Sequence, residues 1–107
     1  AKGVGECLDL ILEHIPAQNI LLVSPIQLGE EVWKEEFEPE FNRNSVLVSK
    51  RLKSAYENIA KKRNVHFLAA SEYVKPSTAD QEHLDVAGHS RLADVIYENI
   101  NINWKCA

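Results

Sequence analysis

A short stretch near the end of the chain, residues 80–89, holds a carboxylate, an imidazole and a helix-capping side chain close together. Asp80 and His83 stand three residues apart, and a turn ahead of a helix can bring side chains at that spacing into contact. The carboxylate would orient the imidazole, which could then take a proton from a nucleophile. We therefore expect Asp80 and His83 to be catalytic, with His83 as the base.

The nucleophile that such a pair would serve has no counterpart in the sequence. A reactive serine stands in a sharp turn with small neighbours, such as Gly-x-Ser-x-Gly or Gly-Asp-Ser. None of the serines of this chain has such neighbours: Ser24, Ser45, Ser49, Ser54, Ser71, Ser77 and Ser90. We therefore expect the chain to be inactive without a further segment that carries the nucleophile.

The same stretch allows two other interpretations. In the first, Asp80 and His83 are surface residues of a turn, Asp85 caps the next helix, and the chain is a non-catalytic α/β interaction domain. In the second, four side chains with oxygen and imidazole groups bind a metal ion: Asp80, His83, Asp85 and His89. Their spacing is not that of a recognised zinc or calcium loop. Asp85 could also orient His83 in place of Asp80. We expect no metal and no organic cofactor.

The rest of the sequence predicts alternating helices and strands. Apolar residues at helical spacing predict helices over about residues 5–15 and 45–62, and a third helix after Asp85. Short apolar runs at residues 20–23 and 65–69 predict strands, the first of them covered on both faces. This order implies two parallel strands joined by a right-handed crossover, with helices on the faces of the sheet. The predicted fold class is a three-layer α/β/α arrangement.

The loop expected at residues 26–44 follows the first strand. Trp33, Phe37 and Phe41 stand in it among many acidic residues, and they are expected to pack the loop against the core. Because ligands of such sheets bind at the carboxyl ends of the strands, Ile26 and Trp33 are predicted to line an acyl or alcohol pocket.

Two strands are too few for a stable sheet of this kind. An apolar strand with an unpaired edge would be open to aggregation. We therefore expect residues 1–107 to be the C-terminal part of a single domain, whose first strands come from an N-terminal segment present in the folded particle. The sequence leaves open whether copies of the particle form a homo-oligomer.

Composition limits the partners and the compartment. A net charge of −4 and the lack of a basic stripe argue against nucleic acid, and no apolar run is long enough for a membrane span. Cys7 and Cys106 lie near opposite ends of the chain, which favours two free thiols in a reducing compartment over a bridge between the termini. Without a visible signal peptide, the expected location is the cytoplasm.

Residues 80–89 resemble the last conserved block of the SGNH or GDSL-type hydrolases, a family of esterases, lipases, acyltransferases and carbohydrate deacetylases on a flavodoxin-like α/β/α fold. That block is Asp-x-x-His, followed by Leu, a polar residue that starts a helix, and Gly-His. The matching residues here stand in register: Asp80, His83, Leu84, Asp85, Gly88 and His89. The strand that ends in Ser24 and Pro25 also resembles the family, and residues 27–30 are most similar to its arylesterase branch.

This resemblance implies a Ser-His-Asp triad that hydrolyses or transfers small-molecule carboxylic esters through an acyl-serine. His83 would be the general base and Asp80 the group that fixes its tautomer. The family's Gly-Asp-Ser block and the Gly and Asn blocks of its oxyanion hole have no counterpart here. Position 81 is Gln where the family most often has Gly, a change that an ordinary backbone angle would tolerate.

Overall fold

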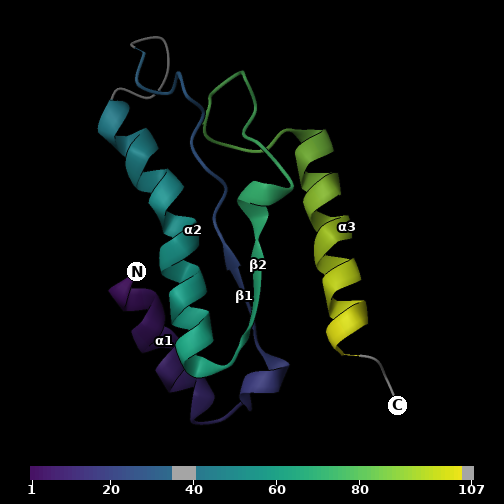
Figure 1. Ribbon diagram of the computed structural model, residues 1–107. Coiled ribbons are helices and arrows are strands. Elements are labelled where there is room, and N and C mark those ends of the chain that lie inside the picture. Colours follow the sequence, from purple (N-terminus) through teal and green to yellow (C-terminus); the bar gives the residue numbers. More distant parts are fainter. Residues whose placement is uncertain (35–40, 105–107) are drawn as a thin grey trace.

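A computed structural model describes residues 1–34 and 41–104 of the chain (Figure 1). Five main elements follow one another: α1 (Lys2–Leu12), β1 (Leu21–Ser24), α2 (Arg43–Arg63), β2 (His66–Ala69) and α3 (Val86–Asn103). Short 3₁₀ turns precede β1 and follow β2. The predicted order of helices and strands is confirmed, and with it the α/β fold class.

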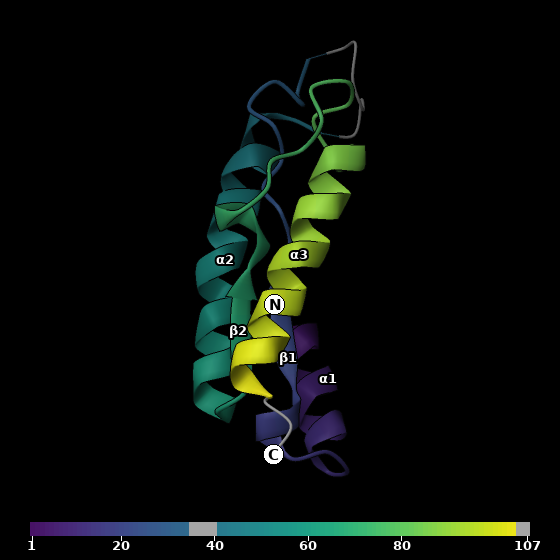
Figure 2. The ribbon, with the colours of Figure 1, turned by 90° about the vertical axis from the view of Figure 1, so that its right-hand side faces the viewer.

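The two strands pair in parallel between layers of helix. Leu21 lies opposite His66 and Ser24 opposite Ala69, so all four residues of each strand are in register. The sheet lies between α2 and α3 in Figure 1, and Figure 2 shows α3 in front of the sheet with α1 and α2 behind it. The three predicted layers are therefore present, and the carboxyl ends of both strands point to the same edge.

The main core joins α1, α2 and the sheet. Leu8 of α1 is 4% exposed and packs with Ile20, Ala60 and Val65, which lead into or out of the strands and α2. Arg63 adds a polar link, because its guanidinium donates two hydrogen bonds, of 2.8 and 3.2 Å, to the carboxylate of Asp9. These contacts fix α1 and α2 to the same face of the sheet.

The ends of α1 and the start of α2 differ from the predictions. Helix α1 starts three residues before the predicted residue 5 and ends at Leu12, three residues before the predicted residue 15, with Glu13 as its C-cap. Helix α2 starts at Arg43 because Asn42 caps it: the Asn42 side chain accepts a hydrogen bond from Ser45 N at 3.0 Å, and Ser45 Oγ accepts one from Asn42 N.

Helix α3 meets the sheet through fewer buried residues than its sequence pattern suggests. Val95 is buried and Leu92 and Ile96 are half-buried, whereas the apolar residues Ala93 and Ile100 are exposed. After its last turn, the Trp104 ring packs edge-on against His66 of β2, with 4.5 Å between ring centroids.

The described residues contain no membrane-spanning helix and one exposed cysteine. No helix in residues 1–34 or 41–104 has the length and apolar character needed to cross a membrane. Cys7 is exposed on α1, and Cys106 lies outside the described residues, so the two free thiols stay a prediction.

Candidate active site

The turn that carries Asp80 and His83 is closed by backbone hydrogen bonds. Ser77 N donates to His83 O at 2.7 Å, and Gln81 N donates to Ser77 O at 2.8 Å. Helix α3 begins directly after this turn, where the carboxylate of Asp85 accepts a hydrogen bond of 2.7 Å from Gly88 N. The predicted cap is confirmed, and it fixes the turn to the start of α3.

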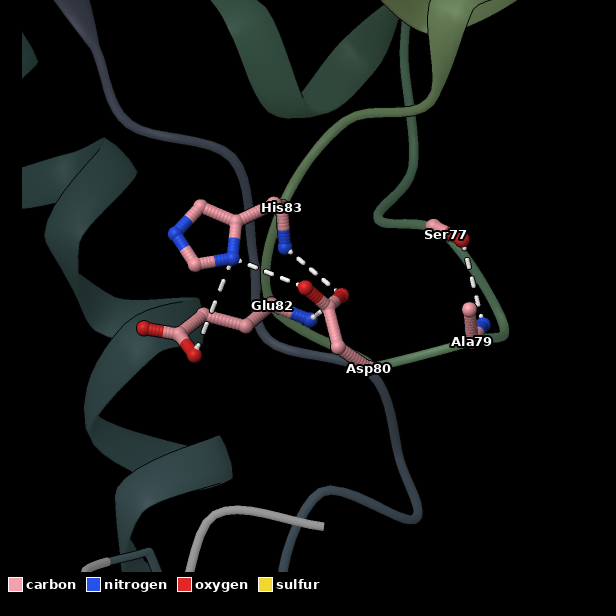
Figure 3. Close-up of polar contacts among 5 residues, drawn as sticks. All are labelled: Ser77, Ala79, Asp80, Glu82 and His83. Atoms are coloured by element: carbon pink, nitrogen blue, oxygen red, sulfur yellow. Dashed lines mark hydrogen bonds and ion pairs between the residues drawn. The ribbon is translucent and has the colours of Figure 1, made fainter.

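Asp80 is at the centre of the turn and uses both carboxylate oxygens (Figure 3). Its Oδ1 accepts hydrogen bonds from the backbone N–H groups of Glu82 and His83, each at 2.9 Å. Its Oδ2 lies 2.8 Å from Nδ1 of His83. Two of these contacts hold the carboxylate still while the third orients the imidazole, so the structure brings Asp80 and His83 together as a pair.

The same contacts set the charges of the pair. The two backbone N–H groups, of Glu82 and then of His83, and the His83 ring lower the pKa of Asp80 to about 2. The hydrogen bond to Asp80, with the nearby charges of Glu82 and Asp80, raises the pKa of His83 above its ordinary value of 6.5. The Glu82 carboxylate lies 3.9 Å from His83 Nδ1. Asp80 is therefore ionised at neutral pH.

The contact with Asp80 also selects the tautomer of His83. An ionised carboxylate only accepts hydrogen bonds, so Nδ1 carries the proton and neutral His83 has its lone pair on Nε2. The His83 side chain is 73% exposed, and its ring points away from Ser77 (Figure 3). Within residues 1–34 and 41–104, no hydrogen bond occupies Nε2. The geometry is that of a general base whose proton-accepting atom is open.

Two alternatives for residues 80–89 find less support, namely Asp85 in place of Asp80 as the partner of His83 and a metal site, whereas the non-catalytic interpretation stays open. The ring of His83 contacts Asp80, whereas Asp85 is engaged in the helix cap. His89 is exposed in the first turn of α3. Among the described residues, no three side chains of His, Cys, Asp or Glu come together to hold a metal ion.

The two predicted substrate contacts lie apart from each other. Ile26 lines a cavity of about 470 Å³, together with Phe41 and Leu52. Trp33 lines a separate hollow of about 250 Å³, where the Arg43 guanidinium stacks on its ring at 4.2 Å from the centroid. Neither lining, as far as the structure describes it, includes Asp80 or His83. Phe37 lies outside the described residues.

A larger cavity, which was not predicted, lies between the loop after β1 and the loop after β2. It measures about 630 Å³, and among the residues on its wall are Gly29, Lys50, Ser71, Lys75 and Gln81. Thr78 and Gln81, which belong to the turn that carries Asp80 and His83, also line it, so the cavity adjoins that turn. Two signals in the sequence point toward this place: the binding of ligands at the carboxyl ends of parallel strands, and Gln at position 81 where the family most often has Gly.

The condition under which Gln would be tolerated at position 81, an ordinary backbone angle, is not met. Gln81 has φ of 61°, in the left-handed region that favours glycine. It takes this angle because contacts with the loop after β1 hold it there, including a hydrogen bond of 2.7 Å from Gly29 N to Gln81 O.

No hydrogen bond joins a described serine to the ring of His83. Ser24 is completely buried at the end of β1, and its hydroxyl, like that of Ser71, has no hydrogen-bond partner among the described residues. Ser77 is the serine of the turn itself, and its Oγ accepts a hydrogen bond of 3.1 Å from Ala79 N (Figure 3).

The fold places the chain among α/β proteins with a parallel sheet, and the Asp80–His83 turn follows the carboxyl end of β2. Protein-family models and curated proteins were compared with the sequence, and neither comparison finds a match. Solved structures do match. Est24, a carbohydrate acetylesterase from Sinorhizobium meliloti, aligns with a TM-score of 0.75 and 22% identity, over 94% of this chain and 49% of that chain.

A carbohydrate acetylesterase family member from the same organism aligns with a TM-score of 0.77 and 20% identity, over 98% of this chain and 51% of that chain. A further crystal structure gives a TM-score of 0.79 and 21% identity, over 96% of this chain and 49% of its own. The chain therefore spans about half the length of the structures it matches. At these identities the likeness establishes the α/β fold.

Proposed function

We propose that this chain is the C-terminal part of an SGNH-type serine esterase, in which His83 is the general base and Asp80 fixes its tautomer. The observation that carries the proposal is the contact of 2.8 Å between Asp80 Oδ2 and His83 Nδ1, with Nε2 left open. The likeness of the fold to two carbohydrate acetylesterases supports ester hydrolysis as the reaction.

The proposed reaction passes through an acyl-serine. A serine hydroxyl gives its proton to Nε2 of His83 while its oxygen bonds to the ester carbonyl carbon, and the carbonyl π electrons move to the oxygen. When the bond to the alcohol breaks, the leaving oxygen takes the proton from His83. Water then attacks the acyl carbon with His83 again as base, the bond to the serine oxygen breaks, that oxygen takes the proton back from His83, and the carboxylic acid is released. Ionised Asp80 stabilises the imidazolium in both steps.

The serine and the oxyanion-hole donors are proposed to come from a segment that supplies further strands. Two observations support such a segment: the described sheet has two strands, and the matched structures are about twice as long as this chain. On α1, Leu10 is 64% exposed and Ile11 41%, an apolar face of the kind that further chain would cover.

We infer that the substrate is a small-molecule carboxylic ester. Ile26, on a wall of mostly apolar side chains, and Trp33 remain the proposed substrate contacts. The same proposal includes a cytoplasmic location, no nucleic acid or membrane partner, and no cofactor. These parts of it rest on composition and on the resemblance.

The test is His83→Ala in the protein at its full natural length, with a short-chain nitrophenyl ester as substrate. Loss of a general base should lower kcat by about 10²–10⁴-fold. His89→Ala is the matched control, because His89 is also an exposed histidine of this region and is expected to leave turnover unchanged. A serine-directed phosphonate, followed by mass spectrometry, should label one serine outside the residues weighed above. Unchanged turnover in His83→Ala would refute the proposal.

A further inference from the structure

Gln81 is the residue whose backbone conformation most needs an explanation. It stands between Asp80 and the two N–H groups, of Glu82 and His83, that bind the Asp80 carboxylate. Its φ of 61° is uncommon for any residue with a side chain, and such an angle persists only where the surroundings enforce it. A rotation at Gln81 would therefore turn both N–H groups away from Asp80.

The surroundings that enforce this angle come from two loops. Gln81 O accepts a hydrogen bond of 2.7 Å from Gly29 N, and the side-chain oxygen accepts a longer one of 3.4 Å from Glu31 N. On the other side, the Gln81 side-chain nitrogen donates to Thr78 O at 3.3 Å. Gln81 thus joins the loop after β1 to the turn of the Asp80–His83 pair.

The partner of Gln81 is a glycine for a steric reason. A Cβ atom added at Gly29 would overlap Oε1 of Gln81 and lie 2.6 Å from its Cδ and 2.8 Å from its Cβ. No glycine in the described residues has a positive φ, so backbone freedom does not explain Gly29. The close approach of the Gln81 side chain does explain it.

We propose that Gln81 is a positioning residue, held on Gly29, that keeps the Asp80 carboxylate and the His83 ring in contact. The proposal rests on the proposed function of that pair and extends it to two further residues. Both Gly29 and Gln81 also line the cavity of about 630 Å³, so a ligand there would touch the contact between Gly29 and Gln81.

The test is a rescue experiment in the protein at its full natural length. Gly29→Ala should push Gln81 out of place and weaken the contact between Asp80 and His83. The double variant Gly29→Ala with Gln81→Gly should restore it, because glycine at 81 has no side chain to clash and takes φ of 61° freely. The pKa of His83, measured by NMR with His14, His66 and His89 as internal references, reports the contact without relying on catalysis.

Among the described residues, the charged groups that face His83 are Asp80 and Glu82, so loss of the Asp80 contact should lower the pKa of His83 toward 6.5. Gly29→Ala should show this fall together with at least a tenfold lower kcat, and the double variant should recover most of both. A double variant no better than Gly29→Ala, or a His83 that titrates in Gly29→Ala as in the wild type, would overturn the proposal.

A second pair of variants leaves Gly29 intact, in case Gly29→Ala does not fold. Gln81→Val should lower the pKa of His83 more than Gln81→Gly does, because a β-branched residue resists a positive φ. Equal pKa values in the two variants would contradict the proposed role. If His83→Ala keeps its activity while the pKa responds as described, the catalytic proposal fails and the positioning contact stands.

Discussion

Replacing Asp80 with asparagine changes the partner of His83 while keeping the shape of the turn. The Asn side-chain oxygen can still accept the hydrogen bonds that Glu82 N and His83 N give to Oδ1. The amide nitrogen then faces His83 Nδ1, and because it can only donate, the His83 proton moves from Nδ1 to Nε2. Nε2 is the atom that must accept a proton, so the dominant tautomer of the variant is inactive.

The size of the effect follows from how His83 is held. Asp80 makes the one short polar contact of the ring, so no other described residue preserves its orientation. The ring is also 73% exposed, so water can support a minority of correctly oriented rings. General-base catalysis contributes about 10²–10⁴-fold. We therefore expect kcat of Asp80→Asn to fall by about 10²–10³-fold, in the lower part of that range.

The pH profile provides a second measurement. Unprotonated His83 is the active form, so kcat/KM rises with pH through the pKa of His83, which is above 6.5 in the wild type. Asp80→Asn removes the largest cause of that rise, and the acidic limb should move to lower pH. Glu82→Gln is the control: it removes a charge 3.9 Å from Nδ1 and should move the limb in the same direction by less. Wild-type turnover and an unmoved limb in Asp80→Asn would show that Asp80 does not orient the base.

Two predictions concern the scaffold that carries the pair. Leu8→Ala removes a side chain that is 4% exposed between α1 and Ala60 of α2, and it should lower the free energy of unfolding by about 2–5 kcal/mol in urea denaturation. A loss below about 1 kcal/mol would mean that α1 is not part of the core. Asn42→Ala removes the cap of α2 and should lower the same free energy by about 1 kcal/mol, whereas Asn42→Asp, which can still accept from Ser45 N, should stay near the wild type. Equal losses in the two variants would argue against the capping box.

Much of the fold could be predicted because its patterns are local. The apolar run at β1 and the helical spacing of α2 need only neighbouring residues to specify an element, and the order of elements then implies a parallel sheet. The turn of Asp80 and His83 is local in the same way, since its hydrogen bonds join residues at most a few positions apart. Because these patterns are local, the order of elements and the Asp80–His83 contact predicted from them agree with the structure.

The features that could not be predicted depend on residues far apart in the sequence. The backbone angle of Gln81 is set by Gly29, which belongs to the loop after another strand. The inward face of α3 centres on Val95, although Ile100 is just as apolar, because only contact with the sheet decides which side chain is covered. The separation of Ile26 from Trp33 likewise reflects how the loop after β1 lies against α2.

The attachment of α3 bears on the local stability of the chain. Of its 18 residues, Val95 is the one that is buried, whereas α2 buries three and has side-chain or left-handed caps at both ends. Segments with few buried contacts open at lower free energy than the global unfolding of a domain. Hydrogen exchange should therefore be faster in the amides of α3 than in those of α2. The turn that carries Asp80 and His83 is joined to the first turn of α3 through Asp85, so local opening of this helix should also disturb the proposed general base.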